Sequence, residues 1–498
     1  GQYVRGQWPE KVADDAALRR AVLAPVASPA PAGLDAYGGI LAVAFDAGGW
    51  FRVARRNGRW WLVTPDGHGF FSLGVNAVTA TGGRSYVAGR ETMFRDLPPA
   101  SAAWAAFRGT GDDRRGEQGA GRGRRFAHGT WFDFGAANLT RVDGADWLAC
   151  WRTRTLARLA GWGFNTLGAW SDPALGAAHR LAFTRSLEIR GGFGNVATGH
   201  DWWGRMPDPF DPRFAAAAER AAIEATRGVR DDPWLLGYFV DNELPWAAPG
   251  PDGRWALARG TLHGEARSAA KQAFIAELKR RYATPERLAE AWGMPITDWS
   301  ALEAVNFPAP APQAAHPAIA ADYSAWLTRY AEVYFATVAT ALRRHDPHHL
   351  LLGGRFAATT PEVITAAAAH ADVLSFNVYA DLPGHGLDLT LLRRLDRPLL
   401  VSEFHFGSDD RGPFGKGLVS VWTEAGRGPA YARYVAAAAD EPQLVGAHWF
   451  QYADQPVTGR LLDGENAHIG LVAITDVPFA GFTRAVQAAN AQVRASLG

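Results

Sequence analysis

The chain has 498 residues, of which 48% are hydrophobic and 20% charged, and this balance excludes both a disordered and a fibrous protein. Its 51 Lys and Arg residues nearly balance 50 Asp and Glu residues, so the net charge of +1 supplies no bulk attraction to nucleic acid or to an anionic membrane. No apolar run approaches the ~20 residues of a membrane-spanning helix, and the single cysteine, Cys150, excludes an internal disulfide.

The chain opens with a mixed segment, residues 1–49, which we expect to be an N-terminal extension. It shows no charged-then-apolar secretion signal, although a signal removed before residue 1 would leave no trace. Residues 50–63 then alternate in polarity around Asn57-Gly58, a pair that predicts a tight hairpin turn.

After the hairpin, short apolar runs alternate with amphipathic or alanine-rich runs. The predicted strands are residues 70–78, 164–170, 187–190, 234–241, 350–356, 373–379, 398–404 and 446–451. The predicted helices are residues 147–160, 212–230, 322–344, 361–370, 389–395, 430–439 and 482–496. We expect Asp322 to be the N-cap of the long third helix.

This alternation of strands and helices favours a parallel sheet, and eight strands favour a closed (β/α)8 TIM barrel. A doubly wound open sheet would alternate in the same way, but no glycine-rich phosphate loop follows any strand. Long insertions at 84–146 and 244–312 follow the first and fourth strands. We therefore expect one catalytic barrel over residues 50–498 that includes both insertions.

An Arg/Gly-rich run at residues 108–125 lies inside the first insertion and resembles an RNA-binding tract. It lacks the interleaved aromatic residues of such tracts and contains Asp112, Asp113 and Glu117. We interpret it as a surface loop and expect no nucleic-acid partner.

Acidic residues end two of the predicted strands. The fourth strand runs into Asp241-Asn242-Glu243, and the seventh runs into Ser402-Glu403. Each carboxylate taken alone is explained by a helix N-cap or an arginine partner, since a buried carboxylate without partners is costly. Strands four and seven, however, lie across the ring from each other, so both side chains would face one another at its carboxyl end.

Two facing carboxylates suit hydrolysis of a glycosidic bond with retention of configuration. We predict Glu403 as the nucleophile and Glu243 as the acid/base. Asn242 is placed to bind a sugar 2-hydroxyl, Tyr379 to donate to Glu403, and Trp449 to form a sugar platform. Core packing remains the alternative for Tyr379 and Trp449, and it is our expectation for His448.

The full set of predicted substrate-binding residues is Asn76, Trp170, His200, Asp241, Asn242, Arg355, Asn377, Tyr379, His405, Trp449 and Gln451.

The chain resembles glycoside hydrolase family 50, the β-agarases, within the clan of retaining barrels that carry an Asn-Glu pair after strand four. The similar segments, in order, are FFSLGVNAV at 70–78, GWGFNTLGAWSD at 161–172, MPDPFDPR at 206–213, DDPWLLGYFVDNE at 231–243, VSEFHFGSDDRG at 401–412, and residues 446–476 with DGENAHIGL. A lone Asn-Glu pair is weak evidence, whereas this ordered set is specific.

The resemblance implies a barrel, retention, and cleavage of β-1,4 linkages after galactose in agarose, usually from a chain end. It places Glu243 at the acid/base position and Glu403 at the nucleophile position. Two departures concern substrate subsites. The segment before residue 50 is too short for the carbohydrate-binding-like domain that usually precedes the barrel, and Leu244-Pro245-Trp246 stands where the family often has a Lys-Ser-Trp-like sequence.

Three alternatives remain: a glycosidase for a different hexose polysaccharide, a non-catalytic carbohydrate-binding barrel, and a metal-dependent barrel hydrolase. The histidines that would ligate a metal show no paired spacing, so we expect no metal and no cofactor. They are His68, His200, His370, His405 and His448. We expect a carbohydrate partner, no membrane span and a secreted or periplasmic location, and the sequence leaves homo-oligomerisation open.

Overall fold

A computed structural model describes residues 16, 20, 33–111, 129–411 and 415–498. Eight parallel strands form one sheet in the order β14-β13-β10-β9-β5-β19-β16-β15. In chain order they are β5 (Ser72–Val75), β9 (Thr166–Leu167), β10 (Ala182–Leu187), β13 (Leu235–Val240), β14 (Leu350–Leu351), β15 (Leu374–Asn377), β16 (Leu399–Phe404) and β19 (Leu444–Trp449).

The two ends of this sheet meet and close it into a barrel. Phe356, which follows β14, donates its N–H to Ser375 O at 2.9 Å and accepts from Asn377 N at 2.9 Å. The predicted (β/α)8 barrel is therefore confirmed. The third strand alone is displaced, because β10 begins five residues before the predicted range of 187–190.

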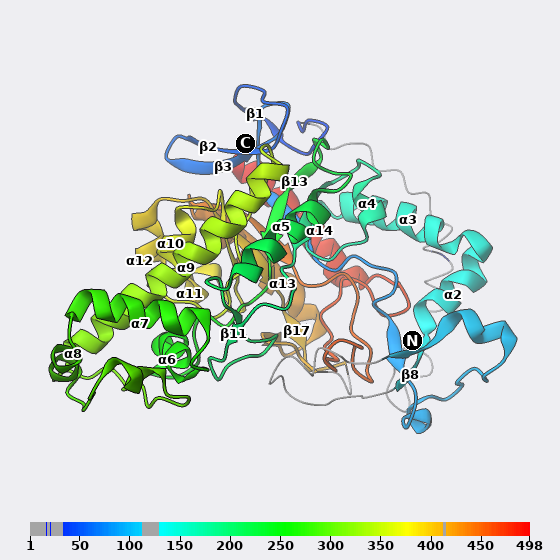
Figure 1. Cartoon of the computed structure of the whole chain (residues 1–498). Coiled ribbons are helices and arrows are strands. Elements are labelled where there is room, and N and C mark those ends of the chain that lie inside the picture. The colour runs from blue at the N-terminus through cyan, green and yellow to red at the C-terminus, as the bar shows by residue number, and fades with distance from the viewer. Residues whose placement is uncertain (1–15, 17–19, 21–32, 112–128, 412–414) are drawn as a thin grey trace.

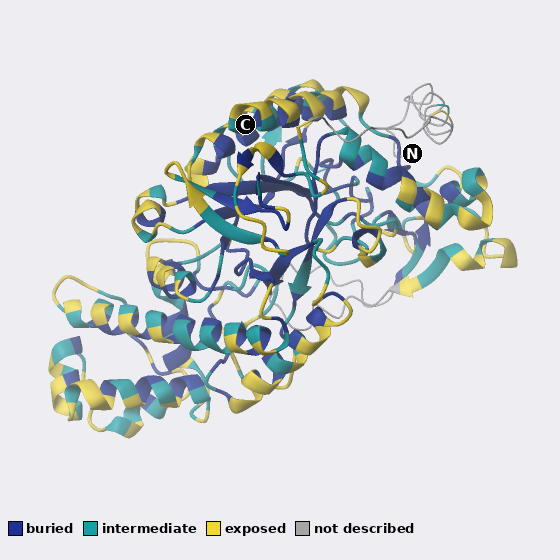
Figure 2. Cartoon of the chain, turned by 90° about the horizontal axis from the view of Figure 1, so that it is seen from above, coloured by how far each residue is buried: buried dark blue, intermediate teal, exposed yellow. Residues whose placement is uncertain are grey.

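A helix follows each barrel strand in the chain, and the longer of these helices surround the sheet (Figure 1). These helices are α3 (Trp147–Gly161), α4 (Pro173–Gly176), α5 (Pro212–Thr226), α9 (Pro317–His345), α10 (Pro361–Ala368), α12 (Leu389–Leu395), α13 (Glu424–Asp440) and α14 (Ala480–Leu497). Figure 2 shows buried strands at the centre and exposed outward faces on the surrounding helices. The short helix α11 (Pro383–Gly386) precedes α12.

The predicted N-cap role of Asp322 is wrong. Helix α9 begins at Pro317, so Asp322 lies inside it and is buried. Its carboxylate accepts hydrogen bonds of 2.7 Å from Tyr282 and Trp292 and pairs with Arg281. Asp322 therefore ties the second insertion to α9, a role that requires a buried carboxylate rather than a helix terminus.

A four-stranded antiparallel sheet closes the amino end of the barrel. Its order is β1 (Ile40–Ala44), β4 (His68–Phe70), β3 (Arg59–Val63) and β2 (Arg52–Arg56). Asn57 and Gly58 form the predicted β2–β3 turn with φ angles of 51° and 79°. Strand β1 belongs to the expected extension, so Ile40–Ala44 of that extension share this sheet with strands of the barrel segment.

Apolar side chains of this sheet continue the core of the barrel. Phe51, Leu62 and Phe70 pack in one buried cluster with Leu350 and Val445 from the barrel strands. Trp60 N donates to Pro442 O at 2.8 Å just before β19. The amino end is thus filled, and functional groups are left to the carboxyl end.

The two long insertions lie on opposite sides of the barrel (Figure 1). The first contains a sheet of β6 (Arg84–Tyr86), β8 (Gly129–Asp133) and β7 (Arg108–Gly111), followed by α2 (Phe134–Asp143). Most of the Arg/Gly-rich run lies outside the described residues. The second contains α6 (Ala256–His263), α7 (Ala269–Tyr282) and α8 (Pro285–Trp292).

Shorter 3-10 turns complete both insertions at Glu91–Met93, Ala102–Phe107, Gly144–Asp146, Gly253–Trp255 and Trp299–Glu303. Two small sheets lie at the carboxyl end of the barrel. One joins β11 (Asn195–Val196) to β12 (Met206–Pro207), and the other joins β17 (Gly407–Ser408) to β18 (Ser420–Val421). Within the described ranges, every helix falls short of the length or hydropathy that a membrane crossing requires.

Candidate active site

The carboxylates of Glu243 and Glu403 meet in one hydrogen-bond network at the carboxyl end of the barrel. Glu243 lies three residues after β13, and Glu403 is the next-to-last residue of β16. Asn377, at the end of β15, is the register partner of Glu403 and donates from Nδ2 to Glu243 Oε1 at 2.8 Å. The fourth and seventh strands thus bring the two residues together, as the topology predicts.

Glu403 is buried, with 4% of its surface exposed, and each of its oxygens receives a donor. Arg355 donates from Nη2 to Oε1, and the Tyr379 hydroxyl donates to Oε2. Burial raises the pKa of Glu403 to about 7, with Arg355 acting against that rise and the charge of Glu243 adding to it. The carboxyl group therefore titrates near neutral pH.

Arg355 fixes the geometry between the two carboxylates. Its guanidinium lies over the rings of Trp170 and Phe239, at 4.6 and 4.8 Å. Its Nε donates to Asn242 Oδ1 at 2.9 Å, and Asn377 Nδ2 also reaches that oxygen at 3.3 Å. Since Oδ1 is occupied twice, the Nδ2 group of Asn242 is the end left for a ligand.

Glu243 is held on its other oxygen by a residue that the sequence did not single out. Trp203 donates from Nε1 to Glu243 Oε2 at 2.6 Å. Trp203 lies on the turn between β11 and β12, and His200 lies three residues earlier on the same turn. A Trp-Trp pair at 202–203 in a polar loop is the one sequence signal that marks this segment.

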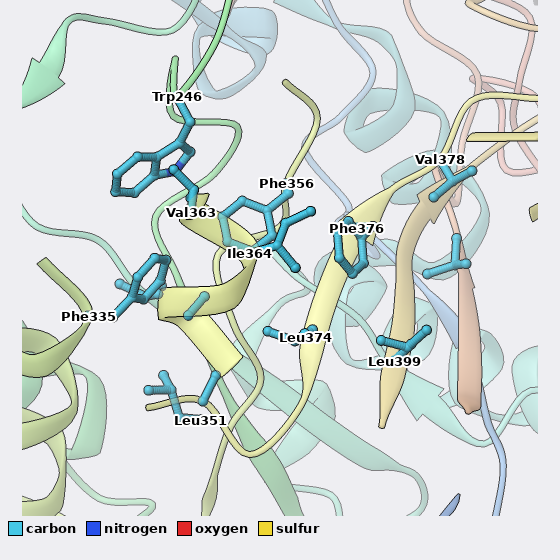
Figure 3. Close-up of a cluster of buried hydrophobic side chains, with 14 of the residues drawn as sticks. Trp246, Phe335, Leu351, Phe356, Val363, Ile364, Leu374, Phe376, Val378 and Leu399 are labelled. Carbon is cyan, nitrogen blue, oxygen red and sulfur yellow. The ribbon is translucent and has the colours of Figure 1, made fainter. Parts of the chain in front are cut away.

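The segment after Glu243 is anchored in the core. Trp246 is 1% exposed and stacks on Phe335 of α9 at 5.6 Å. Figure 3 shows Trp246 and Phe335 at the edge of the cluster that includes Phe356 and Phe376. The backbone of Glu243 has φ 48° and donates to Arg355 O at 3.3 Å. Burial of Trp246 therefore holds the chain in the turn that directs Glu243 toward the site.

Trp170 and Phe450 supply the aromatic surface beside this network. Trp170 is 38% exposed and donates from Nε1 to Glu188 Oε1 at 3.4 Å. Phe450 meets Trp170 edge-on at 6.4 Å and lies 6.3 Å from the ring of His405. Phe450 is not among the residues predicted from the sequence, because the two residues before it, His448 and Trp449, are more typical of a sugar-binding site.

The predicted sugar platform at Trp449 is wrong. Trp449 is 0% exposed, packs against Phe404, Tyr431 and Phe482, and donates to Ile469 O at 3.1 Å. Along β19 the side chains alternate, so Trp449 points outward into the core between strand and helices. His448 points into the barrel, where it contacts Ser72 at 2.8 Å, and the packing role expected for it agrees with this position.

Two more of the predicted residues form hydrogen bonds within the protein itself. Asn76 bridges Ser402 O and Ala169 N at 2.9 Å each, and Gln451 donates to Ala453 O at 2.9 Å.

Asp241 accepts from Ile189 N and from the Tyr334 hydroxyl, and burial raises its pKa to about 6. Both carboxylate oxygens are thus engaged by the protein, one by the backbone after β10 and one by α9, so its position is that of a structural residue.

His405 lies beside the Glu403 network with a defined tautomer. Leu418 N donates to His405 Nε2 at 2.8 Å, which leaves the ring proton on Nδ1. Burial lowers the pKa of His405 to about 3, so the ring is neutral. The ring lies 4.7 Å from Tyr379, and a backbone hydrogen bond to Phe450 partly offsets the lowering of its pKa. The neutral ring is thus held between the Leu418 N–H and the backbone of Phe450.

The described residues contain no group of three or more His, Cys, Asp or Glu side chains arranged to hold a metal ion. The histidines named as candidate ligands are instead separated. His68 pairs with Asp35 at the amino end of the barrel, whereas His405 and His448 make the contacts given above.

A comparison with protein families matches residues 262–395 to the family described as β-galactosidase, Glyco_hydro_42. Beta-agarase B of Vibrio sp. (strain JT0107) is 34% identical to this chain over 530 residues, covering 99% of this chain and 54% of the relative. Beta-agarase A of the same organism is covered over 44% of its length. The chain thus spans about half the length of the curated relatives it matches.

The chain covers a larger share of two similar solved structures than of these curated relatives. One described as an exo-β-agarase superposes with a TM-score of 0.88 at 32% identity, covering 96% of this chain and 70% of its own. PfGH50B superposes with a TM-score of 0.85 at 30% identity, covering 98% of this chain and 71% of its own.

Proposed function

The chain belongs to glycoside hydrolase family 50, and from this premise we propose that it is a retaining glycoside hydrolase that cleaves β-linked galactosides. The observation that carries the proposal is the network in which Asn377, Asn242 and Arg355 join the carboxylates of Glu243 and Glu403. Two carboxyl groups about 5–5.5 Å apart are the apparatus of double displacement at a sugar carbon.

In the first step Glu403 attacks the anomeric carbon while Glu243 protonates the departing glycosidic oxygen. The bond from Glu403 oxygen to carbon forms as the bond to the leaving group breaks, and the proton of Glu243 goes to that leaving group. Arg355 and Tyr379 each donate to one oxygen of Glu403, so they fix its rotamer and stabilise its anionic form.

In the second step Glu243, now a carboxylate, takes a proton from water, and the hydroxide oxygen displaces Glu403 from the sugar. Attack occurs twice at one carbon, so the configuration is retained. Trp203 donates to Glu243 Oε2 and supports the anionic form needed here. Asn242 Nδ2 binds the 2-hydroxyl, a contact that tightens in the transition state.

The proposed substrate is a galactan of the agarose type, cleaved at β-1,4 galactosidic bonds from a chain end. Support comes from relatives described as a β-agarase and an exo-β-agarase. Trp170 offers an exposed aromatic face of the kind on which sugar rings stack. Such a polymer is met outside the cytoplasm, which is why secretion or a periplasmic location belongs to the proposal.

Paired azide rescue tests the two roles. With Glu403→Ala, azide takes the space of the nucleophile and yields an α-galactosyl azide from an aryl β-galactoside. With Glu243→Ala, azide replaces the activated water and yields the β-azide. Each variant alone is expected to lose activity by about a hundredfold or more. Identical azide anomers from both variants, or full activity in either, would exclude these assignments.

Assays with the same enzyme preparation distinguish two alternative functions. A glycosidase for another hexose polysaccharide would release sugar from that polymer and none from agarose, with the same dependence on Glu403. A non-catalytic carbohydrate-binding barrel would bind oligosaccharides without releasing product from any polymer. The intact pair of glutamates favours catalysis, because a binding protein has no use for a nucleophile.

A further inference from the structure

The loop that follows β19, here named the 455–467 loop, comes from the eighth barrel strand, whereas Glu243 follows the fourth. Its two ends are clamped together: Gln455 N donates to Ala467 O at 3.2 Å, and Ala467 N donates to Gln455 Oε1 at 2.6 Å. Its tip returns on itself at Gly459 and Gly464, which have φ angles of 92° and 81°. A Cβ on Gly459 would meet Gly464 O at 2.6 Å, so the loop has one compact form.

Arg460 is fixed at the centre of this loop. Its Nε and Nη2 donate to the two oxygens of Asp463 at 2.7 and 2.6 Å, and Nη2 lies 3.0 Å from Glu465 Oε2. Its backbone N–H donates to Glu465 O at 2.8 Å. The guanidinium is therefore preorganised by its own loop and requires no ligand to hold it.

The Arg460 and Glu465 pair lies beside the aromatic surface that borders the proposed nucleophile. The Arg460 guanidinium lies 5.6 Å from the ring centre of Phe450, and that ring adjoins Trp170 and His405. The negative charge of Glu403 contributes to the raised pKa of Arg460, and the charge of Glu465 contributes to the raised pKa of Tyr379, which donates to Glu403. Both residues thus lie within electrostatic range of Glu403 and Tyr379, on the side of strand β19.

Each member of the pair keeps a polar group available. Within the described residues, the side-chain hydrogen bonds of Arg460 are made by Nε and Nη2 and that of Glu465 by Oε2, and the Glu465 side chain is 41% exposed. A planar donor beside a carboxylate acceptor matches two neighbouring hydroxyl groups of a sugar. Nothing in the proposed reaction uses either group.

We propose that Arg460 and Glu465 bind the C4 and C6 hydroxyls of the galactosyl unit that Glu403 attacks, and so set the enzyme's preference for galactose. The inference rests on the proposed function. Asn242, assigned to the 2-hydroxyl, follows the fourth strand, whereas this pair follows the eighth, across the barrel. A sugar with C1 at Glu403 and C2 at Asn242 directs C4 and C6 toward the 455–467 loop.

The test compares sugars that differ at those two carbons. D-Galactose, its 4-epimer D-glucose and its 6-deoxy form D-fucose are titrated into Glu403→Gln enzyme and into the Glu403→Gln, Glu465→Gln double variant, with affinity measured by NMR. We expect the preference for galactose over at least one analogue to fall by roughly 10- to 100-fold in the double variant, the value of a hydrogen bond to a charged group.

A second arm uses turnover of 4-nitrophenyl β-galactoside, β-glucoside and β-fucoside, which share one leaving group. Glu465→Gln is expected to bring the ratio of kcat/KM for the galactoside to that for the glucoside or the fucoside closer to one, as it does for the ratio of affinities. Glu465→Asp is expected to restore part of this preference for the galactoside. Glu290→Gln, exposed on α8, is the matched control, and thermal melting verifies that each variant folds.

Unchanged ratios in the Glu465→Gln enzyme, or no binding of galactose at all, would overturn the inference. The two proposals fail separately. Altered affinity ratios together with an absence of turnover in the unmodified enzyme would refute the proposed reaction and leave the recognition of galactose standing.

Discussion

As the proposed nucleophile, the buried carboxyl group of Glu403 must be ionised before it can attack a sugar. Burial raises its pKa to about 7, so lowering the pH through that value converts it to an acid that cannot act as a nucleophile. We therefore expect kcat/KM for an aryl β-galactoside to fall tenfold per pH unit below about pH 7. A pH profile of kcat/KM measures this, because it reports the pKa values of the free enzyme.

Replacement of Arg355 tests whether the acidic limb of this pH profile reports the ionisation of Glu403. Its positive charge lowers the pKa of Glu403, so Arg355→Gln should move the acidic limb of the profile to higher pH. Arg152, which pairs with Asp172 on the outside of the barrel, provides the control as Arg152→Gln. A limb that stays in place or moves to lower pH in Arg355→Gln would contradict the assignment.

Two tryptophans that look equivalent in the sequence should respond differently to replacement. Trp449 is fully buried, so Trp449→Ala should cost about 3–5 kcal/mol of unfolding free energy. Trp170 is 38% exposed, so Trp170→Ala should raise KM severalfold with little loss of stability. Urea unfolding and steady-state kinetics on both variants measure the contrast. A raised KM for Trp449→Ala and a loss of stability for Trp170→Ala would instead indicate that Trp449 is the sugar platform.

Residue types and strand ends were enough to predict Glu243, Glu403, Asn377 and Tyr379 as neighbours in space. They were not enough to assign side-chain direction within the run at 448–451, where His, Trp, Phe and Gln are all plausible site residues. Direction there depends on which residue enters the barrel, and only the contact of His448 with Ser72 decides it. Nor does the sequence show that the carboxylate of Asp241 is already occupied by Tyr334.

At the scale of elements, a buried charged cluster joins the root of the 455–467 loop to helix α13. His468 contacts Asp454 at 2.8 Å and Glu424 at 2.5 Å, and Arg427 also pairs with Glu424. Burial alone would lower the pKa of His468, but the carboxylates of Asp454 and Glu424 raise it above its ordinary value. The protonated imidazole is thus the form that holds loop and helix together.

Replacement of His468 should therefore destabilise the fold in a pH-dependent way. A raised pKa means that the stabilisation is complete below the pKa of the unfolded chain and is lost as pH rises through the higher folded value. We expect His468→Gln to cost about 3 kcal/mol at pH 6, because the buried carboxylate of Asp454 loses its charged partner, and less at pH 9.

Urea unfolding at both pH values measures this effect. His385→Gln, at an exposed position on α11, is the control and should change stability at neither pH. The role of the cluster is refuted if the His468→Gln loss is the same at pH 6 and pH 9.

Most barrel elements were predictable because each strand is a compact apolar run. The exception, β10, has the sequence AFTRSL, in which Thr, Arg and Ser interrupt the apolar pattern and shift the prediction downstream. Trp203 reaches Glu243 from the β11–β12 turn, 40 residues earlier in the chain. No local pattern predicts such a contact.

At the scale of the whole molecule, the second insertion and the barrel share one core. Phe274 of α7 stacks on Trp326 of α9 at 4.5 Å, and Trp292 of α8 donates to Asp322. These side chains belong to the same buried cluster as the barrel strands. We propose accordingly that residues 50–498 form one catalytic unit with its insertions, as the alternation of strands and helices predicts.

Calorimetry tests whether the second insertion and the barrel unfold in one transition. The second insertion should unfold with the barrel, so Phe274→Ala should lower the melting temperature of the main transition without splitting it. Its cost should be about 3–5 kcal/mol, since a large buried ring is removed. A new, separate transition at lower temperature would mean that the insertion is an independent domain.

The central claim is that Glu403 forms a covalent bond to the substrate's galactosyl unit. The most direct measurement is mass spectrometry of the peptides obtained after incubation with 2-deoxy-2-fluoro-β-galactosyl fluoride, whose glycosyl-enzyme hydrolyses slowly. The account predicts one added fluorogalactosyl group per chain, carried by the peptide that contains Glu403 and absent from Glu403→Gln enzyme. A label on Glu243, or hydrolysis of β-galactosides that first releases the α-anomer, would contradict it.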